Sequence, residues 1–518
     1  MTETIPFGNS IRFRNWTFWS LLIGLLVYRL VILLVFNLNW VDNDQTLFWL
    51  IAKDYSHGIF HQPFVYGQDY NYAIEAIIAV PFLWCGVPVH IALPLVTHLL
   101  AIAPFLSFAF YYKRNGRLTA AVLVLTISLL LPNSYALITS MPRGFINGLA
   151  LFAFWPWIEH IHNDRVRYAL YGAVVAAAFA INPNVLFIAV LLTGMQYANS
   201  QNRSTAIVMF LCGASIPALL HVAALRWADQ HADQILHFSW NLQWTADYFK
   251  QAFSPAQFFF FKGVVPLTEQ YAAYAWFIFP ALMGYAFYKR KYLLAFLMAT
   301  ICVGVIVSFG INKVNDGTSS VFFPLSRMFL ALPLVLVVFV AELIGETNRS
   351  TFRFAAVLIA GVFLGINLQR VNASIEQEVN NHAIPLSVKS IGELQSQTAQ
   401  LNSFAKSNSI FRFAGMGYPM AYGDFQIIFF AGAAWNDDFP TVALPEYERR
   451  KWESEKIMEI SARHTVWFGG DEYVWDGMNP SANVEAFDIL NLRGYRVNME
   501  LTHRQVLRYH GRSMVIGE

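Results

Sequence analysis

The stretch that decides the architecture reads Trp-Val-Asp-Asn-Asp-Gln at residues 40–45 and Phe-Val-Tyr-Gly-Gln-Asp-Tyr-Asn at residues 64–71. It follows the first long apolar segment, and the chain from 40 to 75 holds five carboxylates: Asp42, Asp44, Asp54, Asp69 and Glu75. Tryptophan, tyrosine, phenylalanine and histidine lie among these acids. Most of the remaining chain is apolar and offers little chemistry, so we predict that this loop is the floor of an active site held by apolar helices.

The composition indicates a membrane protein. The 518 residues are 56% hydrophobic and only 13% charged, with a mean hydropathy of +0.43, whereas soluble domains carry about 25% charged residues. A net charge of +2 without a basic stripe excludes nucleic-acid binding. The three cysteines lack the spacing of metal ligands or of a disulfide framework, and we expect them to be small core residues.

Eleven apolar segments are candidates for crossing a bilayer, which takes ~20 residues of helix. The first is expected to be a retained helix rather than a signal peptide, because no small-residue cleavage site follows it. The fifth and sixth are short and meet at the turn signal Asn182-Pro183-Asn184. The eleven segments are residues 17–37, 91–112, 118–138, 144–160, 168–182, 184–197, 206–225, 270–288, 292–311, 324–344 and 353–368.

The distribution of lysine and arginine predicts which loops face the cytoplasm. By the positive-inside rule, the loops that carry these basic clusters are cytoplasmic, and the acidic loop and the loops at 133–143, 227–269 and 312–323 face outside. Only an odd number of crossings then fits between Asp44 and Lys113, so the apolar piece 73–84 is expected to be an interfacial or re-entrant helix. The basic positions are Arg12, Arg14, Lys113, Arg114, Arg117, Arg165, Arg167, Arg203, Lys289, Arg290, Lys291, Arg349 and Arg353.

The composition changes after residue 369, where polar residues rise and apolar runs shorten to the length of strands. We expect strands at 427–430 and 465–468 and a helix at 445–463 between them. The predicted fold is therefore a polytopic α-helical membrane domain at 1–369, with its first outer loop at 40–90, followed by a soluble outer α/β domain at 370–518.

The sequence Asp42-Asn43-Asp44 has three interpretations. Two carboxylates at a membrane face can act as a general base that takes a proton from a hydroxyl. They can instead hold a divalent cation, which prefers oxygen ligands. The third interpretation is a solvated cap at the end of the first helix. The length and aromatic content of the loop favour a functional role, since an ordinary helix connection has ~2–8 residues.

Several segments together resemble a known family. They are the acidic motif after the first helix, Phe-Trp-Leu-Ile-Ala-Lys-Asp at 48–54, Tyr-Gly-Gln at 66–68 and Ser-Arg-Met-Phe at 326–329. With the helix count, they resemble the polyprenyl-phosphate-sugar-dependent glycosyltransferases of the GT-C class, in particular family 39. That group includes the protein O-mannosyltransferases and the lipid A aminoarabinose transferases.

This resemblance implies inverting transfer of a sugar from a polyprenyl phosphate to a hydroxyl of a lipid, a polysaccharide or a protein. The reaction would take place at the outer face of a bacterial inner membrane, with the C-terminal domain on the same side. The resemblance makes Asp44 the first candidate for the general base and Asp42 the second. Lys53 is a candidate for neutralising the departing phosphate.

Other residues of the outer loops are candidates for binding the substrate. Arg143 and Arg327 are expected at the same outer depth, where a guanidinium can bind a phosphate or simply reach the interface. A second group, together with Glu75, can bind the sugar, or its members can structure a turn around Gly67. This group consists of Tyr66, Gln68, Asp69 and Tyr70.

Arg29, His98 and His221 fall inside predicted apolar spans. Arg29 is expected to reach an acidic partner, the substrate phosphate or another helix, since a charge inside a membrane is costly. His98 and His221 are expected to be satisfied helix-contact residues rather than ligands.

We predict no metal and no cofactor. Metal-dependent members of the class have a second acidic motif in the next outer loop, and residues 133–143 contain no carboxylate. A transporter or flippase of lipid-linked sugars is the main alternative function, and a catalytically inactive scaffold is a third. Transporters place ionisable residues near the midplane, often within paired repeats. This chain has no visible repeat, which favours the enzyme.

Overall fold

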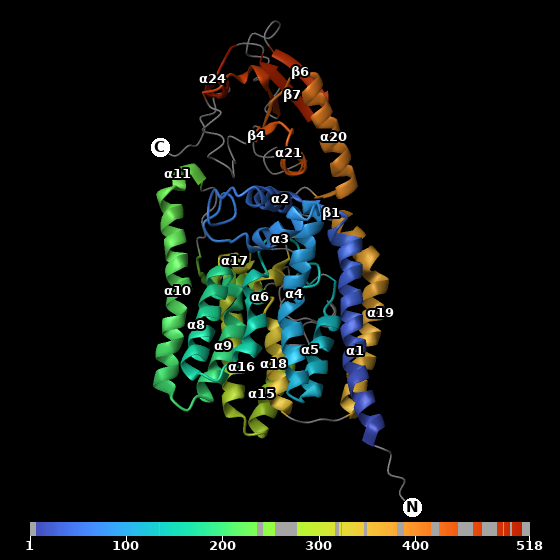
Figure 1. Ribbon diagram of the computed structural model, residues 1–518, viewed down its shortest axis with the longest axis vertical. Coiled ribbons are helices and arrows are strands. Elements are labelled where there is room, and N and C mark those ends of the chain that lie inside the picture. Colours follow the sequence, from blue (N-terminus) through green and yellow to red (C-terminus); the bar gives the residue numbers. More distant parts are fainter. Residues whose placement is uncertain are drawn as a thin grey trace, which may run out of the picture.

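The structure is a computed structural model in which the long helices run side by side in one bundle and a smaller α/β unit lies at one end (Figure 1). The acidic loop lies at the same end as the α/β unit, and α1 begins at the opposite end. The structure describes residues 7–133, 135–235, 242–253, 277–315, 321–322, 324–345, 350–380, 388–415, 424–443, 459–468, 484–490, 492–497 and 500–509.

Helix is present in each of the predicted apolar segments. The segment predicted at 144–160 consists of three short helical pieces in succession, α6 (Asn147–Ala150), a 3-10 turn (Leu151–Phe154) and α7 (Trp155–Ile158). The other bundle helices are α1 (Phe7–Ile32) with a π-helical turn after it (Leu33–Asn37), α4 (Val89–Arg114), α5 (Leu118–Leu130), α8 (Asp164–Ile181), α9 (Leu186–Ala198), α10 (Arg203–Gln230), α15 (Ile278–Tyr288), α16 (Tyr292–Ser308), α18 (Leu332–Ile344) and α19 (Ser350–Asn380).

Five helices among the described residues are long and apolar enough to cross a membrane, judged by length and composition. They are Asn15–Asn37, Val89–Arg114, Arg203–Gln230, Ser326–Ile344 and Thr351–Ala373. These helices fit a membrane-embedded chain, but the predicted count of about eleven spans is not reached in the described ranges. Part of the segment predicted at 270–288 lies outside those ranges.

Proline explains why one predicted span is shorter than expected. The segment predicted at 118–138 is helical only to Leu130, and Leu131 has an extended backbone (ψ 133°). The residue before a proline is driven away from the helical region, and Pro132 follows Leu131. The described residues between Pro132 and Ile146, at 132–133 and 135–146, are consequently in a loop that returns to the acidic end of the bundle.

Helix α10 packs against α8 through two glycines and exposes most of its remaining surface. A Cβ atom built on Gly213 would lie 1.7 Å from the carbonyl oxygen of Ala169, so the two backbones approach closely. Small residues permit this packing between membrane helices. The prediction that the cysteines are core residues is wrong for Cys212, which is exposed on α10, and for Cys85, which is exposed at the end of α3. Outward-facing helix surfaces here are apolar, so an apolar neighbourhood in the sequence does not imply burial.

Two shorter helices lie at the acidic end. Helix α2 (Asn43–Ser56) lies across the end of the bundle, and α3 (Ile74–Trp84) lies just beneath it (Figure 1). Helix α3 occupies the segment 73–84 that was predicted as an interfacial or re-entrant helix. Its 11 residues are too few for a span, which takes ~20.

The C-terminal unit contains a five-stranded mixed sheet of order β4-β3-β5-β7-β6. Strand β3 (Arg412–Gly415) pairs in parallel with β4 (Thr441–Ala443) and β5 (Thr465–Phe468), and β7 (Leu492–Val497) pairs antiparallel with β5 and with β6 (Val484–Ile489). The helices of this unit are α20 (Ile391–Ser407), α21 (Asp424–Trp435) and α24 (His503–Tyr509).

Predictions for this unit had mixed outcomes. The strand predicted at 465–468 is confirmed as β5. The strand predicted at 427–430 is wrong, because these residues belong to α21 and are buried there. A short, fully buried apolar run does not distinguish strand from helix. Most of the helix predicted at 445–463 lies outside the described residues.

The C-terminal unit is attached directly to the acidic loop. Strand β1 (Trp40–Asp42) pairs antiparallel with β2 (Val388–Ser390), which places Asp42 opposite Val388. Helix α21 lies on α2, where the Trp49 and Trp435 ring centroids are 5.2 Å apart. Because α19 continues to Asn380, the boundary predicted at 369 and 370 falls within this helix.

Candidate functional site

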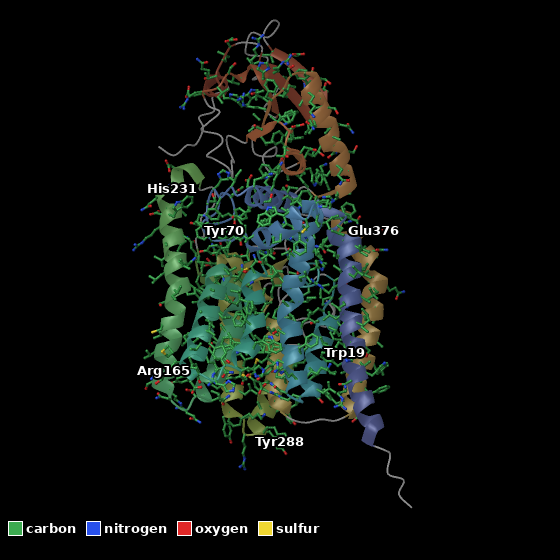
Figure 2. The ribbon with its side chains drawn as sticks, in the orientation of Figure 1. Trp19, Tyr70, Arg165, His231, Tyr288 and Glu376 are labelled. Atoms are coloured by element: carbon green, nitrogen blue, oxygen red, sulfur yellow. The ribbon has the colours of Figure 1, made fainter. Side chains whose placement is uncertain are left out.

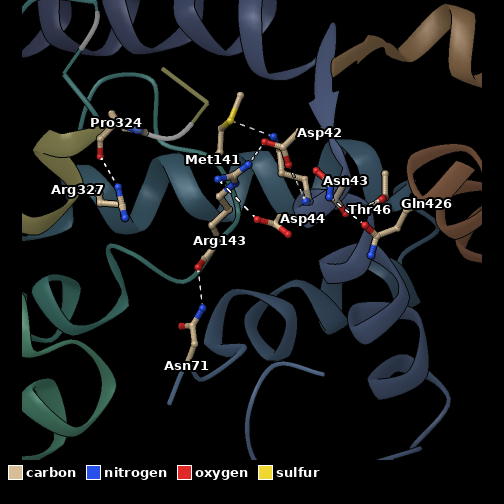
Figure 3. Close-up of polar contacts among 11 residues, drawn as sticks. Asp42, Asn43, Asp44, Thr46, Asn71, Met141, Arg143, Pro324, Arg327 and Gln426 are labelled. Carbon is tan, nitrogen blue, oxygen red and sulfur yellow. Dashed lines mark hydrogen bonds and ion pairs between the residues drawn. The ribbon is translucent and has the colours of Figure 1, made fainter. Parts of the chain in front are cut away.

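The two aspartates of the acidic loop occupy different environments at the start of α2. The Asp42 side chain caps the helix, because its Oδ1 accepts a hydrogen bond of 3.0 Å from the Gln45 amide. Its Oδ2 accepts a hydrogen bond from the Arg143 guanidinium (Figure 3). The side chains of Asp42 and Arg143 are only 0% and 3% exposed. This pair is therefore a buried ion pair.

Asp44 lies in the first turn of α2 and faces the same guanidinium. Arg143 Nη1 is 3.8 Å from Asp44 Oδ2, and the Asp44 side chain is 25% exposed. Arg143 therefore lies between a sealed carboxylate and a partly open one. Burial raises the pKa of Asp42 above its ordinary value, the Arg143 guanidinium lowers it, and the Asp44 carboxylate raises it. Asp44, with access to solvent, is the better placed of the two to exchange a proton with a substrate.

Arg143 is positioned by its own backbone as well as by its ion pair. The Asn71 side-chain amide donates a hydrogen bond of 3.0 Å to the Arg143 carbonyl, and the Gly144 amide donates one of 2.8 Å to Glu75 Oε2. Gly144 has φ +80°, and a Cβ atom there would lie 2.4 Å from Asn71 Oδ1. Only glycine fits this left-handed position beside Asn71. Arg143 and Gly144 thus join the loop that precedes α6 to the segment around Asn71 and Glu75.

Glu75 serves this junction rather than a substrate. Its side chain is fully buried, so the structure does not place Glu75, a predicted substrate-binding residue, at an open surface. Burial raises the pKa of Glu75 to about 8, although the hydrogen bond from the Gly144 amide and the nearby Thr97 hydroxyl lower it. Within the described chain, Glu75 Oε1 has no hydrogen-bond partner. A neutral carboxyl avoids the cost of burying an unpaired charge.

A cavity of about 140 Å3 lies at the acidic end of the bundle beside this junction. It brings together Tyr70 and Arg327, two predicted site residues, and adds Lys313 from α17 (Asn312–Asn315). Figure 2 shows Tyr70 at this end of the bundle. Its polar lining is completed by Asn71, Asn182 and Asn184, and its apolar lining consists of Phe145, Ile181, Pro183 and Met328.

The cavity is structurally continuous with the Arg143 junction. Asn71 lines the cavity and donates to the Arg143 carbonyl, and the ring centroid of Phe145 is 5.7 Å from the Arg327 guanidinium carbon. Arg327 Nη1 donates a hydrogen bond of 3.2 Å to the Pro324 carbonyl (Figure 3), which orients the side chain. The turn signal at 182–184 also contributes, because the Asn184 amide donates to the Arg327 carbonyl at 2.9 Å.

Lys53 does not reach this cavity. Its ammonium donates a hydrogen bond of 2.8 Å to the Ala433 carbonyl and lies 2.6 Å from Asp437 Oδ1, both in the C-terminal unit. Lys53 stands nine positions after Asp44 in the same helix, a rise of about 13.5 Å. Lys53 therefore anchors the C-terminal unit to α2, and the structure does not place it with the candidate phosphate-binding residues.

The Tyr-Gly-Gln element forms a turn. Gly67 has φ +79°, and the Gln68 amide donates to the Val65 carbonyl at 2.9 Å. Tyr66 is buried and donates a hydrogen bond of 2.6 Å to Asp54 Oδ2. The turn interpretation thus holds for Tyr66 and Gln68. Only Tyr70 of the four predicted sugar-binding residues lines the cavity, and the half-buried Asp69 precedes it in the chain.

The ionisable residues inside the spans make structural contacts. Arg29 Nη1 donates hydrogen bonds of 2.6 and 2.7 Å to the carbonyls of Leu137 and Ile138, so it binds the returning loop rather than an acid. His98 Nε2 is 2.7 Å from Asn37 Oδ1, and His221 Nδ1 is 2.8 Å from the Tyr72 hydroxyl. His98 thus contacts the π-helical turn after α1, with its Nδ1 lacking a hydrogen-bond partner among the described residues, and His221 contacts the loop before α3.

Lys313 is the cavity residue that the sequence analysis missed. It stands in the predicted outer loop at 312–323, which also precedes Arg327. Arg327 was selected because it is expected at the outer face of the membrane, where a cation can bind a phosphate. The same reasoning applies to Lys313 and would have identified it. Asn182 and Asn184 were noted as a turn signal but not as polar groups facing a site.

No family model, curated protein or solved structure matches the chain.

What the arrangement can do chemically follows from its geometry. Asp44 can accept a proton, Lys313 and Arg327 can bind an anion, and the tyrosine and asparagines can hydrogen-bond to hydroxyls. Across the described ranges, no three His, Cys, Asp or Glu side chains gather as metal ligands, and Arg143 lies between the two aspartates.

The pH dependence of stability tests the buried state of Glu75. The folded pKa of about 8 exceeds the ordinary 4.5, so the neutral form favours folding below pH ~4.5 and this stabilisation is lost as pH rises toward ~8. We expect the native chain to lose about 1.4 kcal/mol per pH unit in this window relative to Glu75→Gln. Unfolding in detergent, followed by tryptophan fluorescence, measures it. Glu393→Gln at an exposed site is the control, and equal pH slopes for native chain and Glu75→Gln would contradict the assignment.

Proposed function

We propose that this chain is an integral membrane glycosyltransferase that moves a sugar from a polyprenyl-phosphate donor to a hydroxyl acceptor at the outer membrane face. The acceptor is a lipid, a polysaccharide or a protein, and the proposal makes no use of a metal ion. One observation carries it: a partly exposed Asp44, held by the buried Asp42–Arg143 pair, lies at the same end of an apolar bundle as a cavity lined by Lys313 and Arg327.

The proposed reaction is a single displacement. The acceptor oxygen attacks the anomeric carbon of the sugar while Asp44 takes the hydroxyl proton. The bond between the anomeric carbon and the phosphate oxygen breaks, and its electron pair leaves with the polyprenyl phosphate. Attack from the side opposite the leaving group inverts the anomeric centre. Asp44 then returns the proton to water.

The cations of the cavity suit the departing group. Negative charge develops on the phosphate as the bond to the sugar breaks, and preorganised cations stabilise it. The guanidinium of Arg327 is oriented by Pro324 and can bind two phosphate oxygens at once. Lys313 adds a second positive charge to the lining, from α17.

The apolar bundle suits a lipid-linked donor. A polyprenyl chain is as apolar as the bilayer core, so its phosphate lies at a membrane face, and the cavity lies at one end of the bundle, where such a face would be. In this proposal the chain is a multi-pass protein of the bacterial inner membrane and the basic end of the bundle is cytoplasmic. The acidic end and the C-terminal unit are then extracytoplasmic. The family 39 resemblance agrees with this arrangement.

A variant of Asp44 tests the base. Asp44→Asn removes the proton acceptor but keeps the shape of a partly exposed side chain, so we expect release of polyprenyl phosphate to fall by ~10²–10⁴-fold with the fold retained. Release is measured with purified protein, a polyprenyl-phosphate sugar and candidate acceptors.

The control is Asp164→Asn, which removes an exposed carboxylate paired with Arg167 at the basic end. It should turn over as the native chain does. Full turnover by Asp44→Asn would refute the base assignment. Movement of intact donor across sealed vesicles, without cleavage, would support the transporter instead.

A second set of variants tests the phosphate site. We expect Lys313→Gln and Arg327→Gln each to lower the turnover rate by ~10²-fold, the size of effect seen when one preorganised donor is removed. Lys53→Gln should stay within about twofold, because the ammonium of Lys53 binds the C-terminal unit. The reverse order of effects, with Lys53 dominant, would place the phosphate at α2 and overturn the cavity assignment.

A further inference from the structure

A second cavity lies at the basic end of the bundle, opposite the site described above. Its volume is about 390 Å3, and it lies between the turn that joins α15 to α16 and the C-terminal ends of α9 and α18. Figure 2 shows Tyr288, next to this turn, at the far end of the bundle from Tyr70. Its lining includes Arg290, Lys291, Tyr292, Leu293 and Glu342.

The one acidic residue of this lining is already neutralised. Glu342 Oε1 accepts hydrogen bonds of 2.8 Å from Arg117 Nη1 and 3.1 Å from the Tyr112 hydroxyl. The Lys291 ammonium donates a hydrogen bond of 2.5 Å to the Glu342 carbonyl. Among the described residues, Arg290 forms no ion pair. The cavity therefore carries excess positive charge, with Arg290 as its available cation.

Arg290 occupies a backbone position that normally belongs to glycine. The Arg290 and Lys291 amides donate to the carbonyls of Phe287 and Ala286 at the end of α15. In this helix-ending motif the residue at the left-handed position is usually glycine, and Arg290 has φ 58°. The motif is formed by backbone hydrogen bonds alone, so it sets the backbone conformation of Arg290 and makes no use of the arginine side chain. Strained residues of this kind often mark functional positions.

The surroundings of the cavity are those of a membrane interface. Tyr288 and Tyr292 are 79% and 54% exposed, and exposed tyrosines are enriched at the depth of lipid headgroups. Leu293 lines the cavity and is also exposed on α16, and Phe296 is exposed one turn further along the same helix. A polar, basic opening thus adjoins an apolar outer surface, which matches the two ends of a phospholipid.

We propose that this cavity binds the phosphate of an anionic phospholipid headgroup, with Arg290 as its ionic contact and the acyl chains lying along α16. Basic pockets between membrane helices bind such headgroups. The site is separate from the proposed glycosyl-transfer site and does not depend on that function. A soluble phosphate shares the same chemistry, and the experiment distinguishes the two sources.

The experiment measures binding of phosphatidylglycerol, phosphatidylcholine and inorganic phosphate to the full-length protein in an uncharged detergent by native mass spectrometry. The native chain should bind phosphatidylglycerol in preference to phosphatidylcholine. We expect Arg290→Gln and Arg290→Gly to weaken phosphatidylglycerol binding about fivefold, which is the contribution of one cation near a membrane surface. Arg290→Gly suits the left-handed backbone, so its unfolding temperature should be equal to or above the native value.

Arg165→Gln is the matched control, because it removes an exposed cation at the same end of the bundle (Figure 2). It should bind phosphatidylglycerol as the native chain does. An equal loss in Arg165→Gln and Arg290→Gln, or native binding by both Arg290 variants, would overturn the proposal. Displacement of the lipid by millimolar inorganic phosphate would assign the cavity to a soluble anion and would overturn it as well.

Discussion

The buried ion pair between Asp42 and Arg143 is the constraint on which the acidic end of the molecule depends. Two charges taken out of water are costly unless each satisfies the other, and here the pair is supported by the Gln45 amide and by the backbone contacts of Arg143. The pair ties α2 to the loop before α6. Because Asp42 ends β1, it also links both to the strand that opens the C-terminal unit.

The same pair separates the roles of two neighbouring aspartates. Asp42 uses one oxygen to cap α2 and the other to bind Arg143, so it has no surface for a substrate. Asp44 faces the same guanidinium from the open side and keeps access to solvent. The buried member thus serves as a positioning residue, and the partly exposed member is the candidate base. The C-terminal unit also supports the start of α2, because Gln426 Oε1 in α21 accepts a hydrogen bond of 2.9 Å from the Asn43 side-chain amide.

Apolar segments, turn signals and the acidic loop could be located from the sequence, because hydropathy and Gly-Pro-Asn chemistry are local properties. An aspartate three residues before Gln45 is a helix-start signature that would have identified Asp42 as the cap of α2, although the sequence analysis did not use it. The burial of Glu75 could not be predicted, because it depends on Gly144 from a distant loop. Lys313 could have been identified as a candidate, but its presence in the same cavity as Arg327 could not, because that depends on how two segments fold around the cavity. The run at 427–430 has no periodicity that distinguishes a buried helix from a strand.

The most direct measurement of this account is a double-mutant cycle on Asp42 and Arg143, with the free energy of unfolding and the release of polyprenyl phosphate as readouts. Asp42→Asn and Arg143→Gln should each cost about 3–5 kcal/mol, and the double variant should cost much less than their sum. Asp42→Asn should also lose turnover although Asp44 is intact. Additive costs, or full turnover in Asp42→Asn, would contradict the claim that this pair holds the candidate base in place.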